Sequence, residues 1–267
     1  MINNSVKTEY SVALGFFDGL HRAHMTVLEK TLEAAREKGL APAVMLLDEH
    51  PRTVITGEPV PFLQQTSYRD KRLKDMGFTL FSVSFREIKD MSPREFFESV
   101  LCERFSARVL VCGYNYNFGK DAGGDTKALD GLCRERGMTL EICPEFTVGG
   151  ETVSSSSIRS AIENGEIERA DTMLGIPFGF CSEVFTGDRR GRLLGAPTIN
   201  QYLPGELVVP KFGVYASKVY FDGKVYMGVT NIGSRPTFGV SSVRSETYIV
   251  DFSGDLYGRE VRVELHS

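Results

Sequence analysis

Hydrophobic and polar positions alternate in two different ways along the chain, and the change comes near residue 177. In the first part, short apolar runs typical of buried strands stand at 12–15, 43–47, 78–83, 108–113 and 139–143. Amphipathic segments separate these runs. In the first such segment, apolar residues recur at helical spacing before Gly39, namely Met25, Leu28, Leu32 and Ala35. Strands that alternate with helices predict a doubly wound parallel sheet.

From about residue 180 the pattern changes to short strand-like runs separated by polar turns. The runs cover 181–186, 213–221, 224–232, 245–252 and 260–265. We expect one of the turns at 233–236, where Gly233 and Pro236 stand close together. Many short strands with almost no helical spacing predict an antiparallel sheet or barrel. A helix that ends at Gly175 and cannot continue at Pro177 marks the boundary, so we expect domains at 1–177 and 178–267.

Two helix starts are predicted from residues that cap helices. Ser92 precedes Pro93, and Glu95 completes a capping box, which predicts a helix near 92–105. Ser157 is expected to cap a helix over 158–164.

The composition restricts the kinds of partner. The 267 residues carry a formal charge of −4 without a long run of like charge, which argues against nucleic acid or an anionic membrane as partner. No apolar run reaches the ~18 residues of a membrane span, and no secretory signal is visible. The five cysteines contain no C-x-x-C pair, so we expect reduced thiols, no structural zinc and a cytoplasmic protein. Nothing in the pattern indicates an oligomeric state.

Two of the four histidines lie in one glycine-containing run, Gly15-Phe16-Phe17-Asp18-Gly19-Leu20-His21-Arg22-Ala23-His24. The run follows a predicted strand and precedes a predicted helix, whose N-terminus presents free N–H groups and a partial positive charge. His21 and His24 are three residues apart, so on a helical turn they share one face. An isolated pair of this kind is more often a chance feature of a helix start. The glycine context instead favours a phosphate site and nucleotide chemistry.

Further motifs follow in order along the whole chain. They are Asp48–Pro51, Gly113–Lys120, Val153–Arg159, Gly187–Gly191, Leu194–Asn200, Gly213–Tyr215, Asn231–Thr237, Glu246 and Gly254–Gly258. Each is weak alone. Together with the histidine run they resemble, in the same order, the bifunctional prokaryotic riboflavin kinase/FMN adenylyltransferase (FAD synthetase) family. The resemblance implies an N-terminal nucleotidyltransferase domain and a C-terminal kinase barrel.

The resemblance also implies two reactions that use ATP and Mg²⁺, namely riboflavin to FMN and FMN to FAD. For the second, it assigns catalytic roles to His21, His24 and Arg159. The residues implied to bind nucleotide or flavin are Gly15, Phe17, Asp18, Gly19, His50, Gly113, Asn115, Ser155 and Ser156. His50 is equally well explained as a turn residue, and Tyr114, Tyr116 and Phe118 as core packing.

For the kinase reaction, the resemblance implies Glu246 as the base that deprotonates the riboflavin hydroxyl, because an alcohol is a poor nucleophile. Thr198 and Asn200 would supply oxygen ligands to Mg²⁺. A loop whose backbone N–H groups can hold phosphates contains Gly187, Gly191, Gly195 and Pro197.

Three departures from the family pattern leave alternatives open. Ala23 replaces a glycine, which is harmless if its φ is negative and costly if positive. Within Leu194–Asn200, where the family usually has L-G-F-P-T-A-N, Ala196 replaces the phenylalanine and Ile199 the alanine. Family members continue past the position of Ser267, so we expect a barrel without its C-terminal helix and with an unpaired sheet edge. The alternatives are an FMN adenylyltransferase with an inactive kinase barrel, or a non-catalytic flavin-nucleotide-binding protein.

Overall fold

The computed structural model describes residues 8–186, 198–237 and 240–267. The chain forms two compact units, which are described separately below. Unit 1 consists of Met1–Val60 and Ser67–Thr147, and unit 2 of Pro61–Thr66 and Val148–Ser267. The helix that ends before the expected boundary is α8 (Ile167–Leu174), and Gly175 closes it with a φ of 79°. The division into domains at 177 stays a prediction.

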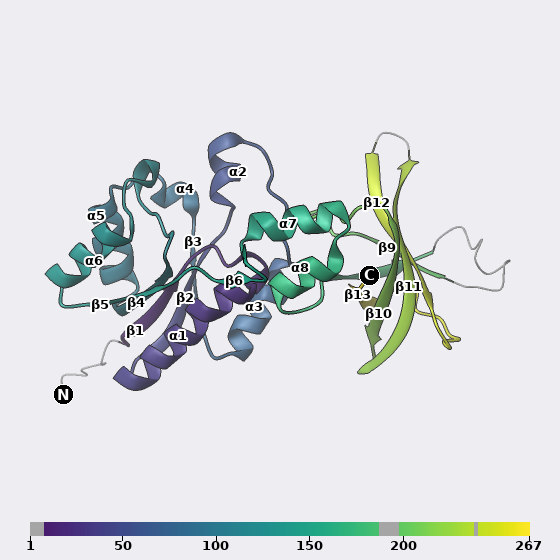
Figure 1. The fold of residues 1–267 in the computed structure, drawn as a ribbon, viewed down its shortest axis with the longest axis horizontal. Helices are drawn as coiled ribbons and strands as arrows, with labels where there is room; N and C mark the ends of the chain where they lie inside the picture. Colours follow the sequence, from purple (N-terminus) through teal and green to yellow (C-terminus); the bar gives the residue numbers. More distant parts are fainter. Residues whose placement is uncertain (1–7, 187–197, 238–239) are drawn as a thin grey trace, which may run out of the picture. The chain divides into compact units, whose positions relative to one another are not determined.

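Unit 1 is built on a parallel sheet, as predicted. Its strands have the order β3-β2-β1-β4-β5 (Figure 1) and are β1 (Tyr10–Leu14), β2 (Ala41–Leu47), β3 (Thr79–Val83), β4 (Ala107–Gly113) and β5 (Thr139–Cys143). The chain adds β2 and β3 on one side of β1 and then β4 and β5 on the other. In doubly wound sheets, ligands bind where the order reverses, at the carboxyl ends of the strands. Here the order reverses between β1 and β4. The carboxyl end of β1 is followed by Gly15, and β4 ends at Gly113.

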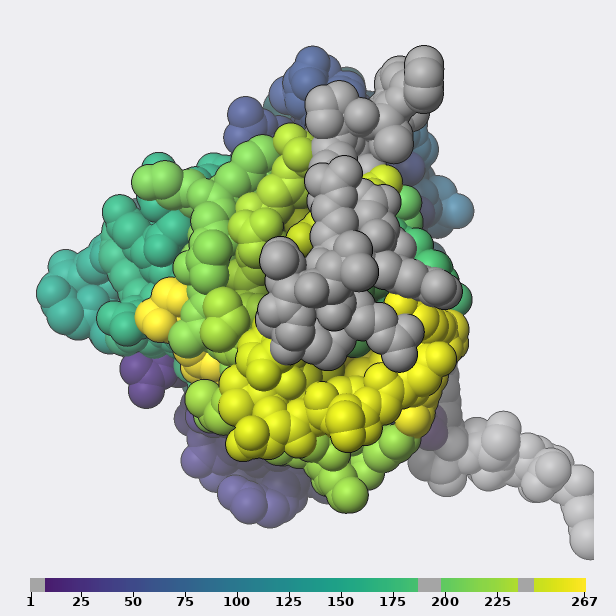
Figure 2. Space-filling view, turned by 90° about the vertical axis from the view of Figure 1, so that its right-hand side faces the viewer, coloured from purple at the N-terminus to yellow at the C-terminus, as the bar shows by residue number. Residues whose placement is uncertain are grey.

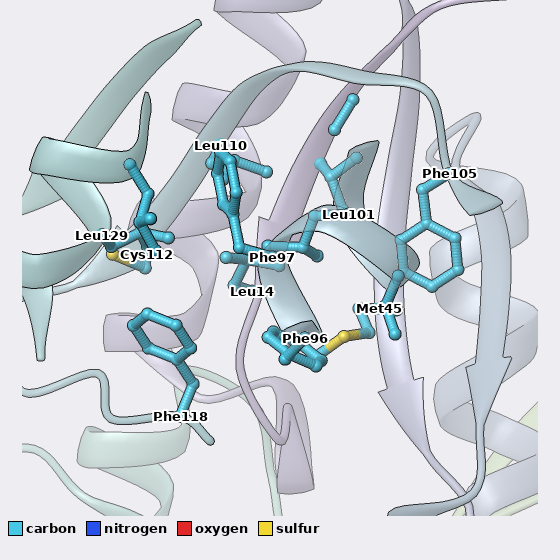
Figure 3. Packing of buried hydrophobic residues seen from close by; sticks show 14 of the residues in the cluster. Leu14, Met45, Phe96, Phe97, Leu101, Phe105, Leu110, Cys112, Phe118 and Leu129 are labelled. Atoms are coloured by element: carbon cyan, nitrogen blue, oxygen red, sulfur yellow. The ribbon is translucent and has the colours of Figure 1, made fainter. Parts of the chain in front are cut away.

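Helices cover both faces of this sheet. They are η1 (Asp18–Leu20), α1 (Arg22–Lys38), α2 (Pro51–Thr56), α3 (Thr66–Asp75), α4 (Phe85–Ile88), α5 (Pro93–Glu95), η2 (Phe96–Arg104), η3 (Lys120–Ala122) and α6 (Thr126–Glu135). Alternate residues of β1 belong to different cores. Leu14 packs with Phe96 and Phe97 of η2 (Figure 3), whereas Ala13 packs with Leu28 of α1. The central strands β1, β2 and β4 are therefore buried on both faces, which explains their continuous apolar runs.

The predicted helix near 92–105 begins as expected and then changes character. The Ser92 side chain accepts a hydrogen bond from the Glu95 N–H at 3.2 Å. From Phe96 onward the segment is a π-helix, in which the Phe105 N–H donates to the Val100 carbonyl. The Ser99 hydroxyl donates to the Glu95 carbonyl at 2.6 Å, a bond that disturbs regular helices. The spacing of hydrophobic residues in the sequence does not distinguish this π-helix from an α-helix.

Unit 2 begins with short elements and two helices. They are β6 (Thr147–Val148, which starts at the end of unit 1), β7 (Glu151–Thr152), α7 (Ser155–Asn164) and α8. The expectation that Ser157 caps a helix over 158–164 is wrong. Ser154 is the cap: its side chain accepts from the Ser157 N–H, and the Ser157 hydroxyl accepts from the Ser154 N–H, both at 3.1 Å. These reciprocal bonds let the helix start three residues earlier.

The rest of unit 2 is a closed antiparallel barrel with the strand order β10-β11-β12-β9-β8-β13. The strands are β8 (Gly179–Phe185), β9 (Thr198–Tyr202), β10 (Gly213–Phe221), β11 (Lys224–Thr237), β12 (Val240–Ile249) and β13 (Glu260–Leu265). In Figure 2 the later strands face the viewer, from green to yellow. Because β13 pairs with both β10 and β8, the expected unpaired edge is wrong for the described strands. The turn expected at 233–236 is also wrong, since these residues lie in β11.

The barrel interior contains a polar layer. The Thr230 hydroxyl lies 2.8 Å from the Ser217 hydroxyl and 2.9 Å from that of Thr247. Gln201 is fully buried, and its amide donates to the carbonyls of Ser182 at 2.6 Å and Val261 at 2.8 Å. Successive side chains of a strand point to opposite faces. The residues that alternate with these buried ones in β9 and β12 therefore point outward.

The seam between β8 and β13 leaves no room for a side chain at Gly179. A Cβ there would lie 2.4 Å from the Val263 carbonyl oxygen and 3.0 Å from the Glu264 Cα. We expect Gly179→Ala to lower the free energy of unfolding by about 1–3 kcal/mol, as overpacking does. Urea titration measures this change. The control is Gly213→Ala, whose Cβ would meet nothing within 4 Å; equal unfolding midpoints for the two variants would contradict the prediction.

Candidate functional site

The turn after β1 has an unusual backbone. Phe17, Gly19 and Leu20 have φ values of 55°, 77° and 45°. Such values are strained for bulky residues and persist only where the surroundings hold them. Phe17 is fully buried and Leu20 is 1% exposed, so packing maintains the turn. At Gly15, a Cβ would approach the Phe17 ring to 3.2 Å. A strained turn at the carboxyl end of the central strand is typical of a functional site.

The two histidines of the motif lie together directly after this turn. His21 is the N-cap of α1, and its Nδ1 accepts a hydrogen bond from the His24 N–H at 3.3 Å. The two rings stack with their centroids 3.6 Å apart and an interplanar angle of 14°. The predicted shared face is therefore present, although His21 precedes the helix. The first N–H groups of an α-helix have no acceptor within it and favour anions.

Both imidazoles are neutral near pH 7. Burial lowers the pKa of His21 to about 4. Burial, followed by repulsion from His21, lowers the pKa of His24 well below its ordinary value, and a backbone hydrogen bond with Asp18 opposes this shift. Within the described part of the chain, the buried Nδ1 of His24 has no hydrogen-bond partner. A neutral imidazole has one N–H donor, and a bound anion favours its protonated form. The pair is suited to receive a phosphate group.

The lowered pKa of His21 predicts a loss of stability in acid. A group with a pKa of about 4 in the folded state and 6.5 in the unfolded state binds protons more readily when unfolded. The free energy of unfolding is therefore unaffected above pH 6.5 and falls between pH 6.5 and 4, by about 3 kcal/mol in full. Urea titrations at pH 7 and pH 4.5 measure this loss.

The matched variant for this measurement is His21→Asn, because asparagine still caps a helix but does not titrate. We expect its unfolding free energy to fall less than that of the natural chain between the two pH values. An equal fall in both proteins would show that another group causes the acid sensitivity.

The replacement of glycine by Ala23 introduces no backbone strain. Ala23 lies in the first turn of α1 and is not among the described residues with positive φ. Alanine would be costly here only if its φ were positive, and it is not. The methyl group leaves the helix N-terminus intact, and alanine favours helix over glycine.

His50 lies beside the same turn. It caps α2, and its Nδ1 accepts from the Arg52 N–H at 3.1 Å. Its ring contacts the Phe16 ring edge-on, with centroids 4.5 Å apart. His50 is thus both a turn residue and a neighbour of the Gly15–His24 run. A role in binding stays a prediction.

The Gly113–Lys120 motif follows β4 at the same end of the sheet. A Cβ on Gly113 would lie 3.4 Å from the Asn115 side-chain oxygen, so the amide lies close over the glycine. Tyr116 stacks on Phe118 with centroids 5.8 Å apart, and Phe118 is 6% exposed. These two rings pack in the core, whereas Tyr114 is 45% exposed.

The remaining residues predicted for adenylyl transfer belong to unit 2. Ser155 and Ser156 occupy the first turn of α7, where helix N–H groups favour an anion. Arg159 lies one turn later, and its Nε donates to the Pro61 carbonyl at 2.8 Å. His21 and His24 belong to unit 1, and the joint action of the two sets of residues stays a prediction.

The residues predicted for the kinase reaction gather on the outer face of the barrel. Glu246 in β12 pairs directly with Asn200 in β9. Thr198 lies two residues before Asn200 in the same strand, so the two side chains lie on one face. That face is the outer one, because Gln201, Ser245 and Thr247 are buried inside the barrel. Two neutral oxygen groups therefore lie beside a carboxylate. Gly187, Gly191, Gly195 and Pro197 lie outside the described residues.

Family models match both parts of the chain: the FAD synthetase model matches residues 3–157, and the riboflavin kinase model matches residues 174–267. The bifunctional riboflavin kinase/FMN adenylyltransferase of Bacillus subtilis is 35% identical over 261 residues, which cover 95% of this chain and 82% of the relative. The protein of the same name from Escherichia coli is 32% identical over 259 residues, with 95% and 82% covered. The chain belongs to the bifunctional riboflavin kinase/FMN adenylyltransferase family.

A solved structure shares the fold of this family member over almost its whole length. It is titled as a macrolide-efflux protein from Streptococcus pneumoniae, with 29% identity and a TM-score of 0.87, and the match covers 98% of this chain and 86% of that one. In the part of the present chain that the structure describes, no helix is long and apolar enough to cross a membrane. The two family domains are those of a transferase that makes flavin nucleotides.

Sequence reasoning missed some residues beside the sites of this family member. Phe16 contacts His50, and no sequence signal indicates that contact. Tyr202 and Arg244 share the outer face with Asn200 and Glu246. The alternation of side chains along a strand would have found them, had 198–202 been recognised as a strand.

Proposed function

We propose that the chain phosphorylates riboflavin to FMN and adenylylates FMN to FAD, using ATP in both reactions. The observation that carries the adenylyl transfer is the stacked, neutral pair of His21 and His24 at the N-terminus of α1. This pair follows the strand at which the sheet order reverses. The observation that supports the kinase reaction is the pairing of Glu246 with Asn200 on the outer face of the barrel.

In the adenylyl transfer, an oxygen of the FMN phosphate attacks the α-phosphorus of ATP. The new O–P bond forms as the bond to pyrophosphate breaks. A phosphate monoester is largely dianionic near pH 7, so no base is needed. Catalysis then rests on positioning and on donors that stabilise charge on the α-phosphate. His21, His24 and the first turn of α1 supply such donors, and we assign Ser155, Ser156 and Arg159 to the pyrophosphate.

In the kinase reaction, the riboflavin 5′-hydroxyl attacks the γ-phosphorus of ATP, and the bond from that phosphorus to ADP breaks. The hydroxyl proton passes to the Glu246 carboxylate. Thr198 and Asn200 fit a magnesium ion, because hydroxyl and amide oxygens are hard ligands on one face beside this carboxylate. When bound with ATP, Mg²⁺ neutralises phosphate charge. The assignment of Gly187, Gly191, Gly195 and Pro197 to the nucleotide phosphates stays a prediction.

The test is to incubate the full chain with Mg²⁺, ATP and either riboflavin or FMN, and to separate the flavins by chromatography. FMN and FAD formed from riboflavin would support both reactions. FAD formed only from added FMN would contradict the kinase assignment and favour an adenylyltransferase with an inactive barrel. A folded chain that binds flavin and forms no product would favour the non-catalytic alternative.

We also propose a cytoplasmic location and small-molecule partners. All five thiols are free, and burial raises the pKa of Cys112 and Cys133 to about 12. Buried, protonated thiols fit a reducing compartment. The net charge of −4 supports nucleotides and flavins, rather than nucleic acid, as partners.

A further inference from the structure

The outer face of the barrel holds an arginine against two aromatic rings beside Glu246. Arg244 precedes Glu246 by two residues in β12 and pairs with Tyr202 in β9. Its guanidinium carbon lies 5.0 Å from the ring centroid of Tyr202 and 5.4 Å from that of Phe185. The two rings stack on each other with centroids 4.3 Å apart and an interplanar angle of 17°.

These contacts fix where the guanidinium lies. Phe185 in β8 pairs with Asn200, and Asn200 pairs with Glu246. The guanidinium therefore extends over β9 and β8, toward the row of residues that contains Asn200 and Glu246. Aromatic faces hold a guanidinium by cation–π contact and leave the N–H groups at its edge for hydrogen bonds.

One hydrogen-bond donor of Arg244 is not used within the described part of the chain. Its Nε is buried there without a hydrogen-bond partner. A buried donor without a partner costs about 1–3 kcal/mol. A guanidinium with a fixed plane and an unpaired donor is suited to a phosphate, which it can bind through two parallel hydrogen bonds.

We propose that Arg244 contacts the phosphoryl group that is transferred to riboflavin, and that Phe185 and Tyr202 position it. This inference rests on the proposed kinase role of the Glu246 face. In that reaction the γ-phosphorus loses its bond to ADP, gains one to the riboflavin 5′-oxygen, and the hydroxyl proton goes to Glu246. The phosphoryl oxygens stay negative throughout and lie near a carboxylate. The guanidinium offsets that repulsion and stabilises the transition state.

The first measurement is steady-state FMN formation by the full chain with Mg²⁺ and ATP. Arg244→Met is expected to lower kcat about 100-fold or more with little change in the KM for riboflavin, and Arg244→Lys to recover part of the loss. The control is Lys218→Met, which removes a positive charge from β10 and is expected to behave like the natural chain. A urea titration of each variant shows that the barrel is folded, because Arg244 and Lys218 belong to unit 2 and FAD formation uses His21 and His24 of unit 1. An Arg244→Met chain with natural kcat would overturn the inference.

A second measurement separates this inference from the proposed function. The thermal stabilisation by FMN and by riboflavin, each with Mg²⁺ and ADP, is compared between the natural chain and Arg244→Met. We expect the variant to lose part of the stabilisation by FMN and none of that by riboflavin. Binding of FMN at the adenylyltransferase site contributes equally to both proteins. If the natural chain forms no FMN, the kinase proposal fails, and the stabilisation measurements alone test Arg244. A loss of stabilisation by FMN but not by riboflavin in Arg244→Met supports a contact between Arg244 and the phosphoryl group. Equal stabilisation of the two proteins by FMN overturns it.

Discussion

Replacing His24 by alanine is expected to reduce FAD formation from FMN by about 10²–10³-fold, the usual cost of removing one donor that stabilises developing charge. The His24 ring stacks on His21, and its buried Nδ1 has no hydrogen-bond partner among the described residues. In the proposed reaction this ring meets the α-phosphate. Alanine favours the helical conformation of α1, so the chain should stay folded, with an unfolding free energy lowered only by the lost ring contacts, and the loss of activity should appear in kcat. Chromatography of the flavins and a urea titration measure the two quantities.

Two comparisons make this prediction specific. Arg22→Ala changes an exposed side chain in the same helical turn and is expected to keep FAD formation near its natural rate. Riboflavin phosphorylation by the His24→Ala chain should also be unchanged, because Glu246 belongs to unit 2. If His24→Ala retains full FAD formation, the stacked pair does not take part in adenylyl transfer.

The parallel sheet was predictable because its central strands β1, β2 and β4 are buried on both faces and are therefore nearly continuous apolar runs. The π-helix η2 was not, since its i to i−5 bonds, such as that from the Phe105 N–H to the Val100 carbonyl, leave no mark on the hydrophobic spacing. The barrel was predicted as a class, yet Gly233 and Pro236 misled the placement of its turns. Both residues are tolerated inside the long strand β11, and local turn preference gave way to the pairing with β12.

The site residues were predictable where the chemistry lies within one short motif. His21 and His24 lie in one turn, and their spacing alone places them on a shared face. The start of α7 was less predictable, because a run of serines offers several caps and only the reciprocal bonds of Ser154 and Ser157 select one. The place of Arg244 on the outer face follows from strand alternation, but its contacts were not predictable, because Phe185 and Tyr202 come from two other strands.

Replacing Glu246 by glutamine is expected to reduce FMN formation from riboflavin by about 10²–10⁴-fold, the range of a lost general base. Glutamine keeps the size of the side chain and its pairing position opposite Asn200, but it cannot take the hydroxyl proton. Because the adenylyl transfer uses a phosphate nucleophile, the same chain should still convert added FMN to FAD at its natural rate. Initial rates of both reactions on one preparation therefore measure the effect, and a urea titration verifies that the barrel is folded.

The control for this change is Glu183→Gln, which neutralises an exposed carboxylate on β8, the strand on the other side of β9. It alters the net charge of the barrel by the same amount, so a general electrostatic effect, such as a weaker attraction of Mg²⁺, would lower FMN formation in both variants. A role as base lowers it only in Glu246→Gln, and mainly in kcat. If the two variants lose activity equally, Glu246 acts through the field of the barrel surface and not as the acceptor of the riboflavin proton.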